Sequence, residues 1–149
     1  MRVLIIGYVN PWRGDDGAGP AAAEALRSRL PGASILVQQQ ITPELAEPVS
    51  EADLVIFIDA AIDIPPGEIR RAEVLPGAGA SAFTHEITPG AILHMAGILY
   101  GRSPRGTLYS IGGSEFGLNE TMSSAVARSV AVVVDEVAAV VLPKVIDSL

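Results

Sequence analysis

The sequence lacks cysteine entirely, which excludes disulfide bridges, thiolate metal sites, iron–sulfur clusters and a cysteine nucleophile. The absence of cysteine also fits a reducing compartment. Long apolar runs are lacking too. The longest apolar stretch, residues 126–142, is interrupted by Arg128, Asp135 and Glu136, so it is too short and too charged to span a bilayer. The N-terminal apolar run ends at Gly7, too early for a signal-peptide core. We therefore expect a soluble, cytoplasmic protein without a membrane partner.

The chain has the length and apolar content of one folded domain. It has 149 residues, of which 49% are hydrophobic, and a chain of this size can bury roughly 70% of its unfolded surface. We treat residues 1–149 as a single domain and expect a monomer. The net charge of −7 repels phosphate backbones, so nucleic acid is not an expected partner.

Short β-branched runs alternate with stretches that favour helices. Helix starts are marked by Thr42-Pro43 and Thr88-Pro89, and Asn119 is the expected cap of a long last helix. We predict strands at 3–6, 34–37, 54–58, 68–74 and 107–111, with helices at 18–30, 42–50, 88–100 and 119–142. This alternation predicts an α/β fold, a three-layer α/β/α sandwich around a mostly parallel, twisted sheet.

Ligands of open α/β sheets bind beyond the C-terminal ends of the strands. Three segments bring polar side chains to that edge: one follows the first strand, one follows the strand at 54–58, and one precedes the helix at 88. Their polar residues are Asn10, Asp15 and Asp16; Asp59 and Asp63; and His85 and Glu86.

These candidates differ in how well a purely structural role explains them. Asp59 ends five apolar residues of a central strand, where an unpaired carboxylate is costly to bury, so a functional role is favoured. Asp63 lies in a proline-rich loop and is interpreted as a solvated turn residue. Of Asp15 and Asp16, one is expected to order the loop and the other to face the crevice. His85 follows a flexible loop, as site residues often do, whereas His94 is interpreted as a helix core or boundary residue.

Other classes of site fit the sequence less well. A dinucleotide loop would need a second glycine where Val9 stands, and the carboxylates of Asp15 and Asp16 would repel a pyrophosphate. No G-x-S-x-G elbow is present. Asp16, Asp59 and His85 together form a set of two carboxylates and one imidazole, which suits nickel, zinc, iron or manganese. A non-enzymatic metal-binding module and a degenerate nucleotide-binding domain stay open at this point.

Three segments together resemble the hydrogenase maturation proteases. Residues 5–20, Ile-Ile-Gly-Tyr-Val-Asn-Pro-Trp-Arg-Gly-Asp-Asp-Gly-Ala-Gly-Pro, are similar to that family's opening strand, its G-x-G-N turn and its R-G-D-D-G-x-G-P-like loop. Residues 52–60 resemble the second block, an apolar strand that ends in Asp-Ala, and residues 84–89 resemble the third, a histidine shortly before a helix. The resemblance spans nearly the whole chain. One departure is Val9 at the second glycine, which implies a different turn before Asn10.

The resemblance implies the same α/β/α sandwich and a specific activity. Members of the family cut a C-terminal extension from the large subunit of a nickel-iron hydrogenase after nickel has been inserted. Matched by motif, Asp16, Asp59 and His85 would contact that nickel, with Asp16 and Asp59 as the catalytic pair and Asn10 and Asp15 as substrate-binding residues. No permanent cofactor is implied, because the precursor of the large subunit supplies the nickel. The alternative is a nickel-binding or metal-delivery module of hydrogenase assembly that lacks protease activity.

Overall fold

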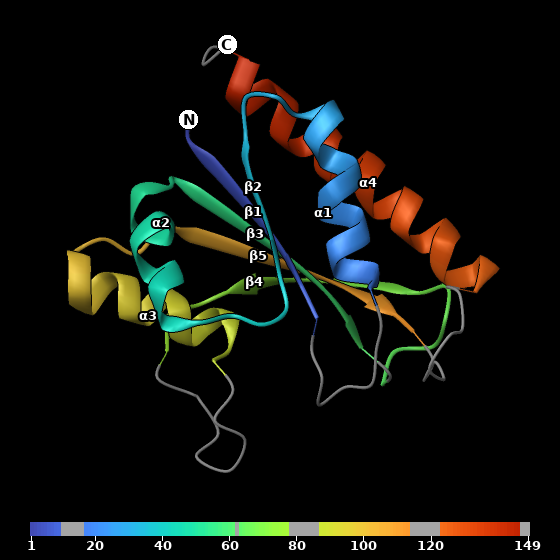
Figure 1. Cartoon of the computed structure of the whole chain (residues 1–149), viewed down its shortest axis with the longest axis horizontal. Coiled ribbons are helices and arrows are strands. Elements are labelled where there is room, and N and C mark those ends of the chain that lie inside the picture. The colour runs from blue at the N-terminus through green and yellow to red at the C-terminus, as the bar shows by residue number, and fades with distance from the viewer. Residues whose placement is uncertain (10–16, 62, 78–86, 114–122, 147–149) are drawn as a thin grey trace.

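The computed structural model describes residues 1–9, 17–61, 63–77, 87–113 and 123–146. They form one five-stranded sheet with helices on both faces (Figure 1). The strand order is β2-β1-β3-β5-β4. All neighbouring strands are parallel except β4, which runs antiparallel to β5 at one edge. The strands are β1 (Val3–Tyr8), β2 (Ser34–Gln38), β3 (Leu54–Ala61), β4 (Ile69–Val74) and β5 (Arg105–Gly112).

Two pairs of helices cover the two faces of the sheet. The long helices α1 (Ala18–Arg29) and α4 (Ser124–Val145) lie on one face, and α2 (Ala46–Glu51) and α3 (Pro89–Tyr100) lie on the other (Figure 1). A short 3₁₀ turn, η2 (Pro43–Leu45), leads into α2. The three-layer α/β/α sandwich with a mostly parallel sheet, predicted from the sequence, is therefore confirmed.

The buried strands are apolar on both faces, as expected when helices cover a parallel sheet. In β3, Ile56 and Ile58 pack towards α1 and α4, whereas Val55 and Phe57 pack towards α2 and α3. Strand alternation then places the next odd residue, Asp59, on the α2/α3 face. β3 is also longer than predicted, so Asp59 lies within the strand rather than just beyond it.

Two glycines allow α1 to approach the sheet closely. A Cβ atom added to Gly7 would lie 2.4 Å from the carbonyl oxygen of Gly19. A Cβ atom added to Gly19 would lie 2.4 Å from the carbonyl oxygen of Ile58 and 3.1 Å from the Cα atom of Asp59. Real Cβ atoms do not come this near to backbone atoms, so glycine is required at both positions. The first turn of α1 is thereby packed against the backbone at Asp59.

The helix signals of the sequence are confirmed in part. The hydroxyl of Thr88 accepts a hydrogen bond from the backbone N–H of Ala91, and Gly101 ends α3 with φ of 75°. Thr42, in contrast, makes no side-chain cap bond, and a 3₁₀ turn follows it. The predicted start of the last helix, at residue 119, is wrong, because α4 begins at Ser124.

That last helix, α4, is capped by Ser123, whose hydroxyl accepts from the N–H of Val126; Asn119, the predicted cap, lies outside the described residues. α4 also continues past Pro143 to Val145. Proline removes one backbone donor, and the burial of Val141 and Val145 on the core side keeps the last turn in place. In the part of the chain that the structure describes, no helix is long and apolar enough to cross a membrane.

Candidate active site

The carboxyl group of Asp59 lies near the C-terminal end of the central strand of the sheet. β3 has two strands on either side of it, and the residue is only 2% exposed. This is the edge at which open α/β sheets bind their ligands. A carboxylate this deeply buried needs hydrogen-bond partners, because the loss of its hydration is costly otherwise.

Hydroxyl groups of the two neighbouring strands supply such partners. The Tyr8 hydroxyl, at the end of β1, lies 3.0 Å from Oδ2 of Asp59. The Ser110 hydroxyl, on β5, lies 2.8 Å from Oδ1. An ionised carboxylate can only accept, so both hydroxyls donate to it. Each carboxylate oxygen of Asp59 thus receives a hydrogen bond from a different strand.

The register of the parallel sheet brings these three side chains into line. Asp59 is the register partner of Ser110. Tyr8 directly follows Gly7, the register partner of Ile58. Residues at the same level of neighbouring parallel strands point to the same face of the sheet. For Tyr8, Asp59 and Ser110 this is the face covered by α2 and α3. The three polar groups therefore meet because of strand register, although they are far apart in the sequence.

Neither Tyr8 nor Ser110 was singled out from the sequence. The sequence prediction ends the first strand at residue 6, which leaves Tyr8 in a loop, and places Ser110 inside the strand at 107–111. A usable signal is that each is a hydroxyl-bearing residue near the C-terminal end of its strand. These two strands lie on either side of the one that carries Asp59.

The other predicted site residues cannot be placed. Asn10, Asp15 and Asp16 fall in residues 10–16, and His85 falls in residues 78–86, all outside the described residues. Their roles stay predictions. Within the described residues, no group of three or more histidine, aspartate or glutamate side chains is arranged to hold a metal ion.

Two residues set aside from the site lie where the sequence indicated. Asp63 is exposed and in a turn, and His94 is half-buried within α3. Of the loop at 75–84, only residues 75–77 are described; Gly77 there donates its backbone N–H to the carbonyl oxygen of Gly90 at 3.1 Å.

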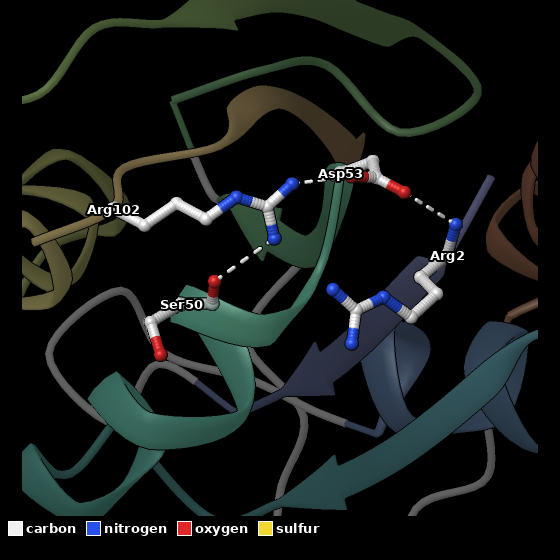
Figure 2. Close-up of polar contacts among 4 residues, drawn as sticks. All are labelled: Arg2, Ser50, Asp53 and Arg102. Atoms are coloured by element: carbon white, nitrogen blue, oxygen red, sulfur yellow. Dashed lines mark hydrogen bonds and ion pairs between the residues drawn. The ribbon is translucent and has the colours of Figure 1, made fainter. Parts of the chain in front are cut away.

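A second polar cluster lies at the opposite, N-terminal edge of the sheet. Asp53, just before β3, accepts a hydrogen bond from the guanidinium of Arg102 and one of 2.7 Å from the backbone N–H of Arg2 (Figure 2). Arg102 also donates to the backbone carbonyl oxygen of Ser50 at 3.1 Å. The hydrogen bond from Arg2, followed by that from Arg102, lowers the pKa of Asp53 below its ordinary value. This cluster ties together the starts of β1 and β3, the end of α2 and the segment before β5.

The fold is that of the hydrogenase maturation endopeptidases. The chain is similar to the [NiFe] hydrogenase maturation protease HybD from Thermococcus kodakarensis, with 26% identity and a TM-score of 0.61 over 91% of this chain and 95% of that one. It is similar to the hydrogenase 2 maturation peptidase from Thaumarchaeota archaeon SCGC_AB-539-E09, with 26% identity and a TM-score of 0.64 over 92% and 96%. The protease HycI from Thermococcus kodakarensis KOD1 has 24% identity and a TM-score of 0.70 over 92% and 90%.

These similarities confirm the resemblance that the three sequence segments predicted. They extend over at least 90% of each chain. The predicted enzyme class, a peptide-bond hydrolase, agrees with the names of these neighbours, which are a protease or a peptidase. No protein-family model and no curated protein matches the chain.

Proposed function

We propose that this protein is an endopeptidase that removes the C-terminal extension of a nickel-iron hydrogenase large-subunit precursor after nickel has been inserted. The observation that carries the proposal is Asp59, a buried and hydrogen-bonded carboxylate at the ligand-binding edge of a maturation-protease fold. The sequence blocks that resemble the family add the rest of the site. They assign Asp16, Asp59 and His85 to the nickel of the substrate, and Asn10 and Asp15 to the substrate chain.

The packing of α1 brings the start of that helix to Asp59. Gly19 in the first turn of α1 packs against the backbone of Asp59. The sequence block that the family resemblance pairs with Asp59, which includes Asp16, directly precedes this helix in the chain.

The donor types also suit the proposed substrate. Carboxylate and imidazole groups are suitable ligands for divalent nickel, and a precursor without nickel offers no cation to an acidic site. In this mechanism a water molecule adds to the scissile carbonyl carbon, the C–N bond breaks, and the departing amine takes a proton. Two routes promote this addition. In the first, the substrate's nickel polarises the scissile carbonyl group or lowers the pKa of the water. In the second, one aspartate removes a proton from the water.

The proposal includes the setting in which the protein acts. We place it in the cytoplasm as a monomer with no permanent cofactor, and its partner is the precursor of the large subunit. The net charge of −7 supports a partner that is not a nucleic acid. Size-exclusion chromatography with light scattering would test the monomer.

Mass spectrometry of a cognate large-subunit precursor tests the activity. The precursor is incubated with this protein, with and without nickel loading. Loss of a C-terminal peptide from the loaded form alone is the expected result. An intact loaded precursor after prolonged incubation would contradict the endopeptidase assignment.

Calorimetry with free nickel distinguishes the protease from the alternative, a metal-delivery module. Tight nickel binding without cleavage would favour the metal-delivery module. Weak nickel binding with cleavage favours a protease that uses the metal of its substrate.

A further inference from the structure

We propose that Tyr8 and Ser110 are positioning residues that hold the carboxylate of Asp59 in the orientation in which it meets the substrate. This inference rests on the proposed endopeptidase function. It assigns a role to two side chains that the family resemblance left without one.

The contacts define the orientation of the carboxylate group. A single donor would fix one oxygen and leave the other free to move about it. Here Tyr8 donates to Oδ2 and Ser110 donates to Oδ1, at 3.0 and 2.8 Å. The two donors come from the strands on opposite sides of β3, so they restrain the carboxyl plane from both sides. Rotation about the Cβ–Cγ bond of Asp59 would break both hydrogen bonds.

The chemistry of the donors suits a carboxylate that meets a substrate. An ionised carboxylate has about four acceptor positions, and each of the two hydroxyls contacts one oxygen. Neutral hydroxyls also stabilise the ionised form without placing a second formal charge beside it. In sites where a carboxylate binds a metal ion, partners of this kind orient the ligand, and their loss typically costs about 10- to 100-fold in metal affinity or activity.

A purely structural role makes a different prediction. If the hydroxyls only satisfy a buried carboxylate, their removal lowers stability but leaves the turnover of the remaining folded protein unchanged. If they position Asp59, kcat falls while KM for the loaded precursor changes little, since the rest of the substrate contacts are intact. The division of the effect between kcat and KM separates the two roles.

The chain offers matched controls for both substitutions. Tyr8→Phe removes the hydroxyl and keeps the ring in the core; Tyr109→Phe does the same to a buried tyrosine on the opposite face of the sheet. Ser110→Ala is matched by Ser129→Ala, which removes a buried hydroxyl that donates to the carbonyl oxygen of Ala125 at 3.1 Å. Ser110→Thr keeps a hydroxyl at the site and serves as the rescue variant.

Cleavage of the nickel-loaded precursor is then measured for wild type and all five variants, with the folded fraction of each checked by circular dichroism. We expect kcat to fall about 10- to 100-fold in Tyr8→Phe and Ser110→Ala, with KM within about twofold of wild type. Tyr109→Phe, Ser129→Ala and Ser110→Thr should stay within about threefold of the wild-type kcat. If Tyr8→Phe does not fold, the comparison of Ser110→Ala with Ser110→Thr decides.

Two other outcomes would contradict the inference, and they distinguish its failure from the failure of the proposed function. If wild type cleaves and both hydroxyl-free variants keep its kcat, the positioning role is refuted and the endopeptidase function stands. If wild type itself fails to cleave the loaded precursor, the proposed function is refuted and this inference falls with it.

Discussion

Two aspartates lie at the two ends of the central strand β3, and their surroundings differ. Asp59, near the C-terminal end, is 2% exposed and accepts hydrogen bonds from two neutral hydroxyl groups. Asp53, just before the N-terminal end, has a side chain that is 34% exposed and pairs with the cationic guanidinium of Arg102 (Figure 2). The buried carboxylate accepts from two hydroxyl groups, whereas the carboxylate at the surface pairs with a cation.

This difference supports the proposal that the active site lies at the C-terminal end of the sheet. A solvent-exposed ion pair such as that of Asp53 and Arg102 contributes little to the free energy of unfolding. Its role is to connect segments that are far apart in the chain. The carboxyl group of Asp59 lies in a medium of low dielectric constant, where interactions between charges are stronger than in water. The comparison therefore predicts that substitutions at the Asp59 end change activity and that those at the Asp53 end change stability.

The largest effect is expected from Asp59→Asn. The amide has the shape of the carboxyl group, and the hydroxyls of Tyr8 and Ser110 can rotate to suit it, so we expect stability to change by only about 1 kcal/mol. The negative charge and the proton acceptor are lost. Removal of a general base or a charged ligand typically costs about 10²- to 10⁴-fold, so cleavage of the loaded precursor should fall by at least about 100-fold, as measured by mass spectrometry of timed samples.

Asp53→Asn is the control for that experiment, because it makes the same chemical change at the other end of the same strand. Its cleavage rate should equal that of wild type. Should Asp59→Asn process the precursor as fast as Asp53→Asn does, the assignment of Asp59 to the active site would have to be abandoned.

A smaller effect, on stability, is expected from Gly19→Ala. The new Cβ atom would meet the carbonyl oxygen of Ile58 at 2.4 Å. Overpacking of this kind costs about 1–3 kcal/mol, because α1 or β3 must shift, and the shift occurs beside Asp59. We expect a lower urea midpoint and slower cleavage in the same variant.

Gly97→Ala in α3 is the matched substitution. A Cβ atom there would lie 3.5 Å from Cβ of Ser103, an ordinary contact, and alanine is the better helix former by about 1 kcal/mol. This variant should be as stable as wild type or more stable, with unchanged cleavage. Equal destabilisation by both substitutions would mean that the close approach of α1 to β3 is not what requires glycine at position 19.

The layers of the fold could be predicted from the sequence because they follow local patterns. All five predicted strands are present in the predicted order, and Thr88-Pro89 begins a helix as its capping chemistry requires. The start of α4 is harder to predict from the sequence, because serine and asparagine are both good caps. The structure shows that Ser123, rather than Asn119, precedes the first residue of the helix. Element boundaries depend on such tertiary contacts, which a single sequence does not reveal.

Of the three residues that form the described part of the candidate site, the sequence pointed to Asp59 alone. Asp59 was identifiable because a carboxylate at the end of an apolar strand is costly to bury. Tyr8 and Ser110 were not, because each is 51 residues from Asp59 in the chain and meets it only through strand register. A one-residue slip of a strand would turn either side chain to the other face, so register must be known before such partners can be assigned.

The smallest effect on stability is expected from Asp53→Asn, and this effect should depend on pH. The pKa of this carboxyl group is lowered from 3.8 in the folded protein, first by the N–H of Arg2 and then by Arg102. A lowered folded-state pKa contributes stability that is fully present above the unfolded value and lost as pH falls through the folded value. Wild type should therefore be slightly more stable than Asp53→Asn at pH 6, and the difference should shrink below about pH 4. Urea unfolding at several pH values measures this, with Asp63→Asn, at an exposed turn, as the control for loss of a surface charge. A difference that stays constant down to pH 3 would show that the carboxylate charge of Asp53 does not tie the N-terminal edge of the sheet together.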